Sequence, residues 1–217
     1  MSGYENILFD LDGTVTESAP GIFHSIRYAM DRMGCRLPDD LDLNVFIGPP
    51  LTVSFRNVLG FSETDADRAL SLYREYYNDR GLFECRIYPG IPELLARLGG
   101  EGRTVALATA KPEVFSRRIL DHFGLTGRFS FIGGASLDAS RRHKDAVISY
   151  PLSNLPGASA ANTVMIGDRD QDVIGARQNG IGCIGVLYGY GTAEELTRAG
   201  AIALAEDCEG LYDLLSE

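Results

Sequence analysis

The sequence predicts an α/β fold with a doubly wound parallel sheet and a small all-helical domain inserted after the first strand. Two observations carry this prediction. Apolar runs of strand length alternate with helical patterns from about residue 89 to residue 205. Between the first apolar run, Ile7–Phe9, and that alternation, the pattern is helical only. Alternating strands and helices are typical of a parallel sheet covered on both faces, here a Rossmann-like core.

The inserted block contains three expected helices. The first has an apolar stripe from Ile22 to Met33 and ends before Gly34, and Gly48-Pro49-Pro50 then interrupts the pattern. A short helix covers residues 53–59, and the capping pair Ser62 and Asp65 opens a longer helix that runs to about residue 80. The expected division is therefore a core of residues 1–15 and 84–217, and a helical cap domain of residues 16–83.

The second half supplies the remaining elements of the core. Strands are expected at the apolar runs 104–109, 129–132, 163–167, 183–187 and 202–205, and helices at 89–98, from 112, after 144, before the stop at 179–180, and at 192–199. In a parallel sheet the insert follows the carboxyl end of the first strand. An insert at that place is expected to act as a lid over the sheet edge.

Composition excludes several classes of protein. The 217 residues are 45% hydrophobic with a formal net charge of −10, which disfavours binding to a nucleic-acid polymer. There is no run of 18 apolar residues, so no membrane span is expected, and the N-terminus lacks the basic region of a signal peptide. The four cysteines show no metal-binding spacing, which indicates reduced thiols and a cytoplasmic protein.

Asp10-Leu11-Asp12-Gly13-Thr14 directly follows the first apolar run. Two carboxylates two residues apart on a strand point the same way. At the carboxyl end of a sheet strand they lie where open α/β sheets bind ligands. Such a pair repels and is costly to desolvate, so it favours a cation site or acid–base chemistry over a surface turn, although Asp-Gly is also a common turn dipeptide.

Further polar residues follow the later strands, namely Thr109, Lys144, Asp168 and Asp172. Parallel strands would bring them to the same edge as Asp10. Carboxylates beside a hydroxyl and a lysine describe a site for Mg²⁺ and a phosphate group. The 20 basic residues include only two lysines, Lys111 and Lys144, which is consistent either with chance or with a need for a compact charge at these two positions.

Together these segments resemble the four motifs of the haloacid dehalogenase superfamily of phosphatases: Asp10-Leu-Asp12-Gly-Thr14, Thr109, Lys144 and Gly167-Asp168-Arg-Asp-Gln-Asp172. The matches span nearly the whole chain in order, and the helical insert resembles that superfamily's small C1 cap. Phe46–Leu51 and Val186–Gly191 are similar to the 5′-nucleotidase-like branch, close to phosphoglycolate phosphatases.

The resemblance implies a Mg²⁺-dependent phosphatase of small phosphorylated metabolites. It implies that Asp10 is the nucleophile and forms an aspartyl-phosphate, and that Asp12 is the general acid and base. It assigns Mg²⁺ to Asp10, the Asp12 carbonyl and Asp168, supported by Asp172. Thr109 and Lys144 would hold the phosphoryl oxygens.

Some alternatives stay open at this point. A phosphomutase or phosphotransferase on the same fold would use the same residues, and a receiver domain is excluded by chain length and by the place of the acidic pair. Lys111 and Arg56 are possible substrate contacts, each weighed against a solvated side chain. The expected state is a monomer or weak homodimer.

Overall fold

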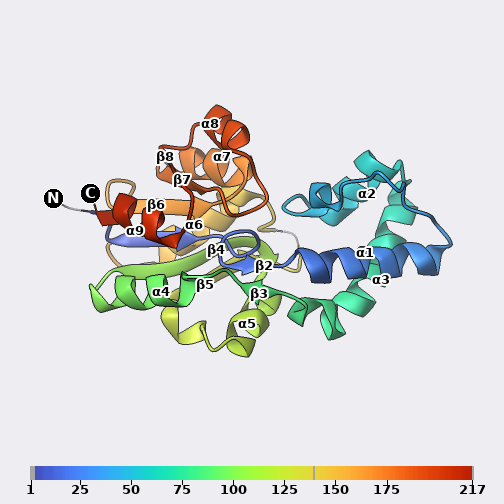
Figure 1. The fold of residues 1–217 in the computed structure, drawn as a ribbon, viewed down its shortest axis with the longest axis horizontal. Coiled ribbons are helices and arrows are strands. Elements are labelled where there is room, and N and C mark those ends of the chain that lie inside the picture. Colours follow the sequence, from blue (N-terminus) through green and yellow to red (C-terminus); the bar gives the residue numbers. More distant parts are fainter. Residues whose placement is uncertain (1–2, 139, 217) are drawn as a thin grey trace. The chain divides into compact units, whose positions relative to one another are not determined.

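The computed structural model describes residues 3–138 and 140–216 of the chain, and it divides into two compact units. The first unit comprises residues 1–17 and 87–217, and the second comprises residues 18–86. Figure 1 shows the elements of each unit. No helix in the described part of the chain is both long and apolar enough to cross a membrane.

The first unit contains a six-stranded sheet in the order β5-β4-β1-β6-β7-β8, and every neighbouring pair is parallel. The expected fold class, a doubly wound parallel sheet, is confirmed. The strands are β1 (Asn6–Phe9), β4 (Thr104–Pro112), β5 (Phe131–Ala135), β6 (Thr163–Gly167), β7 (Gly182–Val186) and β8 (Ala203–Ala205). Because β1 lies between β4 and β6, the carboxyl ends of these three strands are adjacent.

Helices cover both faces of this sheet (Figure 1). Leu8 of β1 belongs to an apolar cluster with residues of α6, α7 and α8, whereas its buried neighbours Ile7 and Phe9 point to the other face. The helices of this unit are α4 (Ile91–Gly100), α5 (Glu113–His122), α6 (Lys144–Asn154), α7 (Asp170–Gln178), α8 (Ala193–Ala199) and α9 (Cys208–Ser216), with a 3₁₀ turn at Thr126–Arg128.

The second unit is helical. Its elements are α1 (Ala19–Met33), η1 (Leu43–Phe46), α2 (Leu51–Leu59), α3 (Glu63–Asp79) and η2 (Gly81–Phe83). Gly34 adopts a left-handed conformation after α1, and the Ser62 hydroxyl accepts a hydrogen bond from the Asp65 amide at the start of α3. The end of α1 and the start of α3 therefore lie where Gly34 and Ser62 predicted them in the sequence. The short strands β2 (Thr16–Glu17) and β3 (Arg86–Ile87) form a separate two-stranded sheet.

Several details differ from the sequence prediction. The short strands β2 and β3 lie in a stretch that was expected to be helical only, and β4 continues to Pro112, where a helix was expected to begin. The strand expected at residues 129–132 is β5, which continues through Gly133 and Gly134 rather than ending there. The reason is packing: a side chain at Gly134 would collide with the backbone of Glu113 and Lys111, so these glycines allow close approach of β4 and β5. The C-terminal helix α9 was not predicted, although it has a start signal in Asp207, whose carboxylate accepts a hydrogen bond from the Gly210 amide at 2.8 Å. No disulfide joins the four cysteines, in agreement with the expected reduced thiols.

The central strand should tolerate truncation poorly. We predict that Leu8→Ala, which removes a fully buried side chain, lowers the free energy of unfolding by roughly 2–5 kcal/mol. The control is the same substitution at Leu137, which is 69% exposed and should change stability by less than about 0.5 kcal/mol. Equal effects of the two variants in urea unfolding would contradict this placement of the core.

Candidate active site

Seven of the eight residues singled out from the sequence lie in the first unit, at the carboxyl edge of its sheet. Asp10 and Asp12 lie in the loop after β1, and Thr109 and Lys111 lie near the end of β4. Lys144 is the first residue of α6. Asp168 directly follows β6, and Asp172 lies four residues further on, in α7. The eighth residue, Arg56, is an exposed side chain of α2 in the second unit.

The loop after β1 is a tight turn whose shape depends on glycine. The Leu11 carbonyl accepts hydrogen bonds from the amides of residues 14–16, and Gly13 has a φ of 86°. A side chain at Gly13 would be strained by this φ and would overlap the Asp168 carboxylate. Gly13 therefore lets the first and fourth motifs meet.

Lys144 lies between two of the carboxylates. Its Nζ is 2.9 Å from Oδ1 of Asp10 and 2.5 Å from Oδ1 of Asp172, and its side chain is 6% exposed. Burial alone would lower the pKa of Lys144, but the neighbouring Asp10 and Asp172 carboxylates outweigh burial and raise it. Lys144 is therefore charged throughout the physiological range.

For Asp10 the surroundings favour the neutral form. Burial raises its pKa to about 6, opposed by the nearby Lys144 ammonium and reinforced by the Asp172 carboxylate. The same two influences, burial and then neighbouring carboxylates, hold the pKa of Asp168 well above its ordinary value. Burial is the largest cause of both shifts, and neighbouring carboxylates add to it.

Asp168 is fully buried and held by the loops around it. Its carboxylate accepts hydrogen bonds from the Thr14 hydroxyl at 3.3 Å and from the Tyr190 amide at 2.8 Å. The Tyr188 hydroxyl in turn donates to the Thr14 carbonyl at 3.2 Å. Thr14 is part of the first motif. The Tyr190 contact is made by a backbone amide, and no pattern of side chains in the sequence could have predicted it.

Asp12 forms an ion pair that sequence reasoning did not anticipate. Its Oδ2 lies 2.7 Å from Nζ of Lys111, whose side chain is only 6% exposed. A solvated Lys111 is therefore ruled out. The Thr109 hydroxyl accepts a hydrogen bond from the Lys111 amide at 3.2 Å, which orients the hydroxyl at the end of β4. The second lysine of the chain thus joins the same site as the first.

The residues present fit a hard divalent cation. Oxygen atoms of Asp10, Asp168 and Asp172 lie within 4.8 Å of one another. Oδ1 of Asp12 is buried without a hydrogen-bond partner in the described part of the chain, whereas the buried Oδ1 atoms of Asp10 and Asp172 form ion pairs with Lys144. Four carboxyl groups face two ammonium groups in this cluster, and carboxylate oxygen is the ligand that Mg²⁺ prefers.

A further pair that the sequence did not reveal fixes the start of α7. Oε1 of Glu195, in α8, accepts hydrogen bonds from Nε of Arg169 at 2.8 Å and from the Asp170 amide at 2.9 Å. The Arg169 amide donates to Oδ2 of Asp172 at 3.1 Å. At the start of α8 the Thr192 hydroxyl accepts a hydrogen bond from the Glu195 amide.

The fold and this site define a class: an α/β enzyme with an acidic, lysine-containing centre at the carboxyl edge of a parallel sheet. The model of the haloacid dehalogenase-like hydrolase family matches residues 7–186. The chain belongs to this family, which confirms the resemblance stated from the motifs and the assignment to the hydrolases.

Known proteins similar to the chain carry several names. A 5′-nucleotidase of Pseudomonas aeruginosa is 47% identical over 193 residues, covering 89% of this chain and 87% of that protein. The tyrosine-protein kinase PtkA of Mycobacterium tuberculosis is 41% identical over 87% of this chain, which spans only 64% of PtkA. A phosphoglycolate phosphatase of Mesorhizobium japonicum is 29% identical over 85% of this chain and 83% of that protein.

Among solved structures, a predicted phosphatase from Clostridium acetobutylicum has a TM-score of 0.92 and 42% identity, and the match covers 98% of both chains. The similar proteins thus include the two names that the sequence resemblance had suggested. They also include a protein named a tyrosine kinase. The sequence motifs had left phosphoryl transfer open as an alternative but had not indicated a kinase.

The buried charge of Asp10 should make stability depend on pH in the absence of metal. Its folded-state pKa of about 6 lies above the ordinary 3.8, so this group stabilises the fold below pH 4. That contribution is lost as the pH rises through 6. We predict that Asp10→Asn gains stability relative to the wild type by on the order of 1–3 kcal/mol between pH 4 and pH 7.

The measurement is urea unfolding at several pH values in the presence of a chelator. Asp145→Asn, which alters an exposed carboxylate in the first turn of α6, is the matched control. Parallel stability profiles for the wild type and Asp10→Asn would contradict the account of the Asp10 environment.

Proposed function

We propose that the protein is a Mg²⁺-dependent phosphatase that hydrolyses small phosphomonoesters through an aspartyl-phosphate on Asp10. The observation that carries the proposal is the contact of Asp10 with Lys144 beside Asp168 and Asp172, with the Asp12–Lys111 pair two residues away. A carboxylate attacks an anionic phosphate only where charge is neutralised, and this cluster provides a buried cation next to the nucleophile.

In the first step an Oδ atom of Asp10 attacks phosphorus, and the bond from phosphorus to the leaving oxygen breaks. Asp12 gives its proton to that oxygen, so the alcohol leaves neutral. In the second step water attacks phosphorus, Asp12 takes a proton from it, and inorganic phosphate and free Asp10 are formed. Lys144 and the Thr109 hydroxyl hold the phosphoryl oxygens through both steps.

Asp10, Asp168 and the main-chain carbonyl of Asp12 would hold Mg²⁺, with Asp172 supporting from behind. The cation supplies charge neutralisation for the phosphoryl group. The carboxylate oxygens of Asp10, Asp168 and Asp172, which lie within 4.8 Å of one another, support this part of the proposal.

The proposal extends to the substrate class, the cap, the cellular location and the oligomeric state. We place 5′-nucleotides first, because the 47% identical relative is named a 5′-nucleotidase, and phosphoglycolate second. Residues 16–83 would serve as a cap, with Arg56 and Lys111 as candidate substrate contacts. The protein would act in the cytoplasm as a monomer or weak homodimer.

Phosphoryl transfer to an acceptor other than water is the second candidate. The 41% identity to a protein named a tyrosine kinase favours it specifically. It would use the same Asp10 intermediate, with a hydroxyl in place of the attacking water.

The deciding assay measures phosphate release from 5′-nucleotides, phosphoglycolate, sugar phosphates and p-nitrophenyl phosphate, with Mg²⁺ and with chelator. We expect release that requires Mg²⁺, with kcat/KM highest for a 5′-nucleotide. ATP with a tyrosine-containing peptide forms a parallel arm. Transfer to the peptide without phosphate release would favour the kinase and contradict hydrolysis.

Substitutions of Asp10 and Asp12 should distinguish the role of the nucleophile from that of the general acid and base. We predict that Asp10→Asn abolishes turnover because no nucleophile is left. Asp12→Ala should lower kcat by about 10²–10⁴-fold, the usual contribution of general acid–base catalysis. Asp145→Asn is the control and should keep full activity. Retained turnover in Asp10→Asn would refute the nucleophile assignment.

A further inference from the structure

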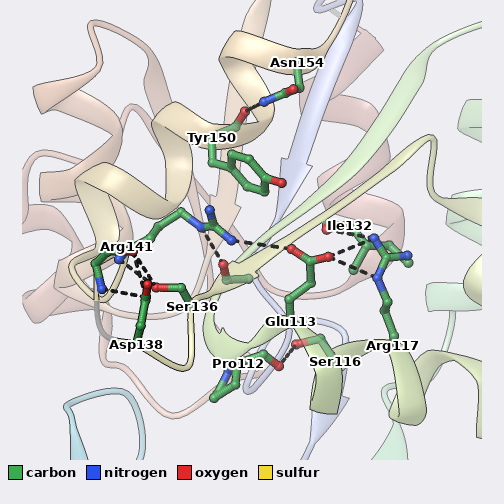
Figure 2. Close-up of polar contacts among 12 residues, drawn as sticks. Pro112, Glu113, Ser116, Arg117, Ile132, Ser136, Asp138, Arg141, Tyr150 and Asn154 are labelled. Carbon is green, nitrogen blue, oxygen red and sulfur yellow. Dashed lines mark hydrogen bonds and ion pairs between the residues drawn. The ribbon is translucent and has the colours of Figure 1, made fainter.

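The loop that leads into Lys144 is fixed by a network of polar contacts around Arg141, drawn in Figure 2. It connects β5 to α6 and places Lys144 three residues after Arg141, at the first position of the helix. The sequence motifs identify Lys144 alone, and nothing in the proposed chemistry uses Arg141.

The Arg141 backbone closes the loop. Its amide donates to the Ser136 hydroxyl at 2.9 Å, and its carbonyl accepts from the Ser136 amide at 3.0 Å. Asp138 orders the same loop, because its carboxylate accepts hydrogen bonds from the Ser140 amide at 3.0 Å and the Ser140 hydroxyl at 2.8 Å.

The Arg141 guanidinium joins three further elements. Its Nε donates to the Gly134 carbonyl of β5 at 2.8 Å, and its Nη2 lies 3.5 Å from Oε2 of Glu113 in α5. Its central carbon lies 3.6 Å from the centre of the Tyr150 ring in α6, a cation–π contact. Figure 2 shows the guanidinium between Glu113 and the Tyr150 ring.

These partners link the segments that carry Thr109 and Lys144, the two residues proposed to hold the phosphoryl oxygens. Glu113 directly follows the end of β4 that carries Thr109, and it is itself held by Arg117 at 3.0 Å. Tyr150 lies on the same helix as Lys144. Arg141, which precedes Lys144 by three residues, therefore ties the start of α5 after β4 to the middle of α6, and its own side chain is only 23% exposed.

We infer that Arg141 is a positioning residue that holds Lys144 in register with Thr109 for binding of the phosphoryl group. The inference rests on the proposed function. The adjacent Arg142 is exposed and supplies a matched control, because it has the same charge and lies one residue nearer to Lys144. Displacement of a binding group by about 1 Å can cost 10²-fold in rate, so loss of this anchor should be measurable.

The test measures binding of orthovanadate to the full-length protein with saturating Mg²⁺ by calorimetry, together with thermal stability and with kcat and KM on p-nitrophenyl phosphate. We expect Arg141→Ala to weaken vanadate binding about tenfold or more and to raise KM, with Arg142→Ala equal to the wild type. Arg141→Lys, which can keep the charge over Tyr150, should recover part of the loss.

Equal vanadate affinity in the wild type and Arg141→Ala would overturn the positioning role and leave the proposed function intact. No vanadate binding by the wild type would overturn both. If Arg141→Ala does not fold, Glu113→Gln decides in the same assay, because it weakens one arm of the anchor. Unchanged affinity in Glu113→Gln would then overturn the role, and a smaller loss than tenfold would support it.

Discussion

Desolvation of like charges is the constraint on which this structure depends. Asp10, Asp168 and Asp172 present oxygen atoms within 4.8 Å of one another, and Asp168 is fully buried. Lys144 offsets part of this charge, but burial, reinforced by neighbouring carboxylates, still holds the pKa values of Asp10 and Asp168 above their ordinary range. Such an arrangement costs stability, so the surrounding fold must hold it in place. The proposed divalent cation would supply the positive charge that the cluster lacks.

The fold supplies that support through strand order and close backbone contacts. With β1 between β4 and β6, the first motif meets Thr109 on one side and Asp168 on the other. Gly13 removes the side chain that would overlap Asp168, and Gly134 lets β4 and β5 approach each other. The second lysine, Lys111, pairs with Asp12, so both lysines of an otherwise arginine-based chain belong to one site.

Sequence reasoning could place the acidic residues because parallel strands bring their carboxyl ends to one edge. It located Asp10, Thr109, Lys144, Asp168 and Asp172 on that principle. It could not find contacts made by backbone atoms, such as the Tyr190 amide on Asp168, because any residue type provides an amide. It also missed Glu195 on Arg169 and Arg141 on Glu113, since these pairs depend on how helices and loops pack rather than on a local pattern.

The central claim is that the buried acidic cluster binds one divalent cation. The most direct test is calorimetric titration of Mn²⁺, as a substitute for Mg²⁺, into chelator-treated protein at pH 7.5, without substrate. The account predicts one site per chain that is lost in Asp168→Asn and retained in Asp145→Asn. Absence of binding by the wild type, or undiminished binding by Asp168→Asn, would contradict it.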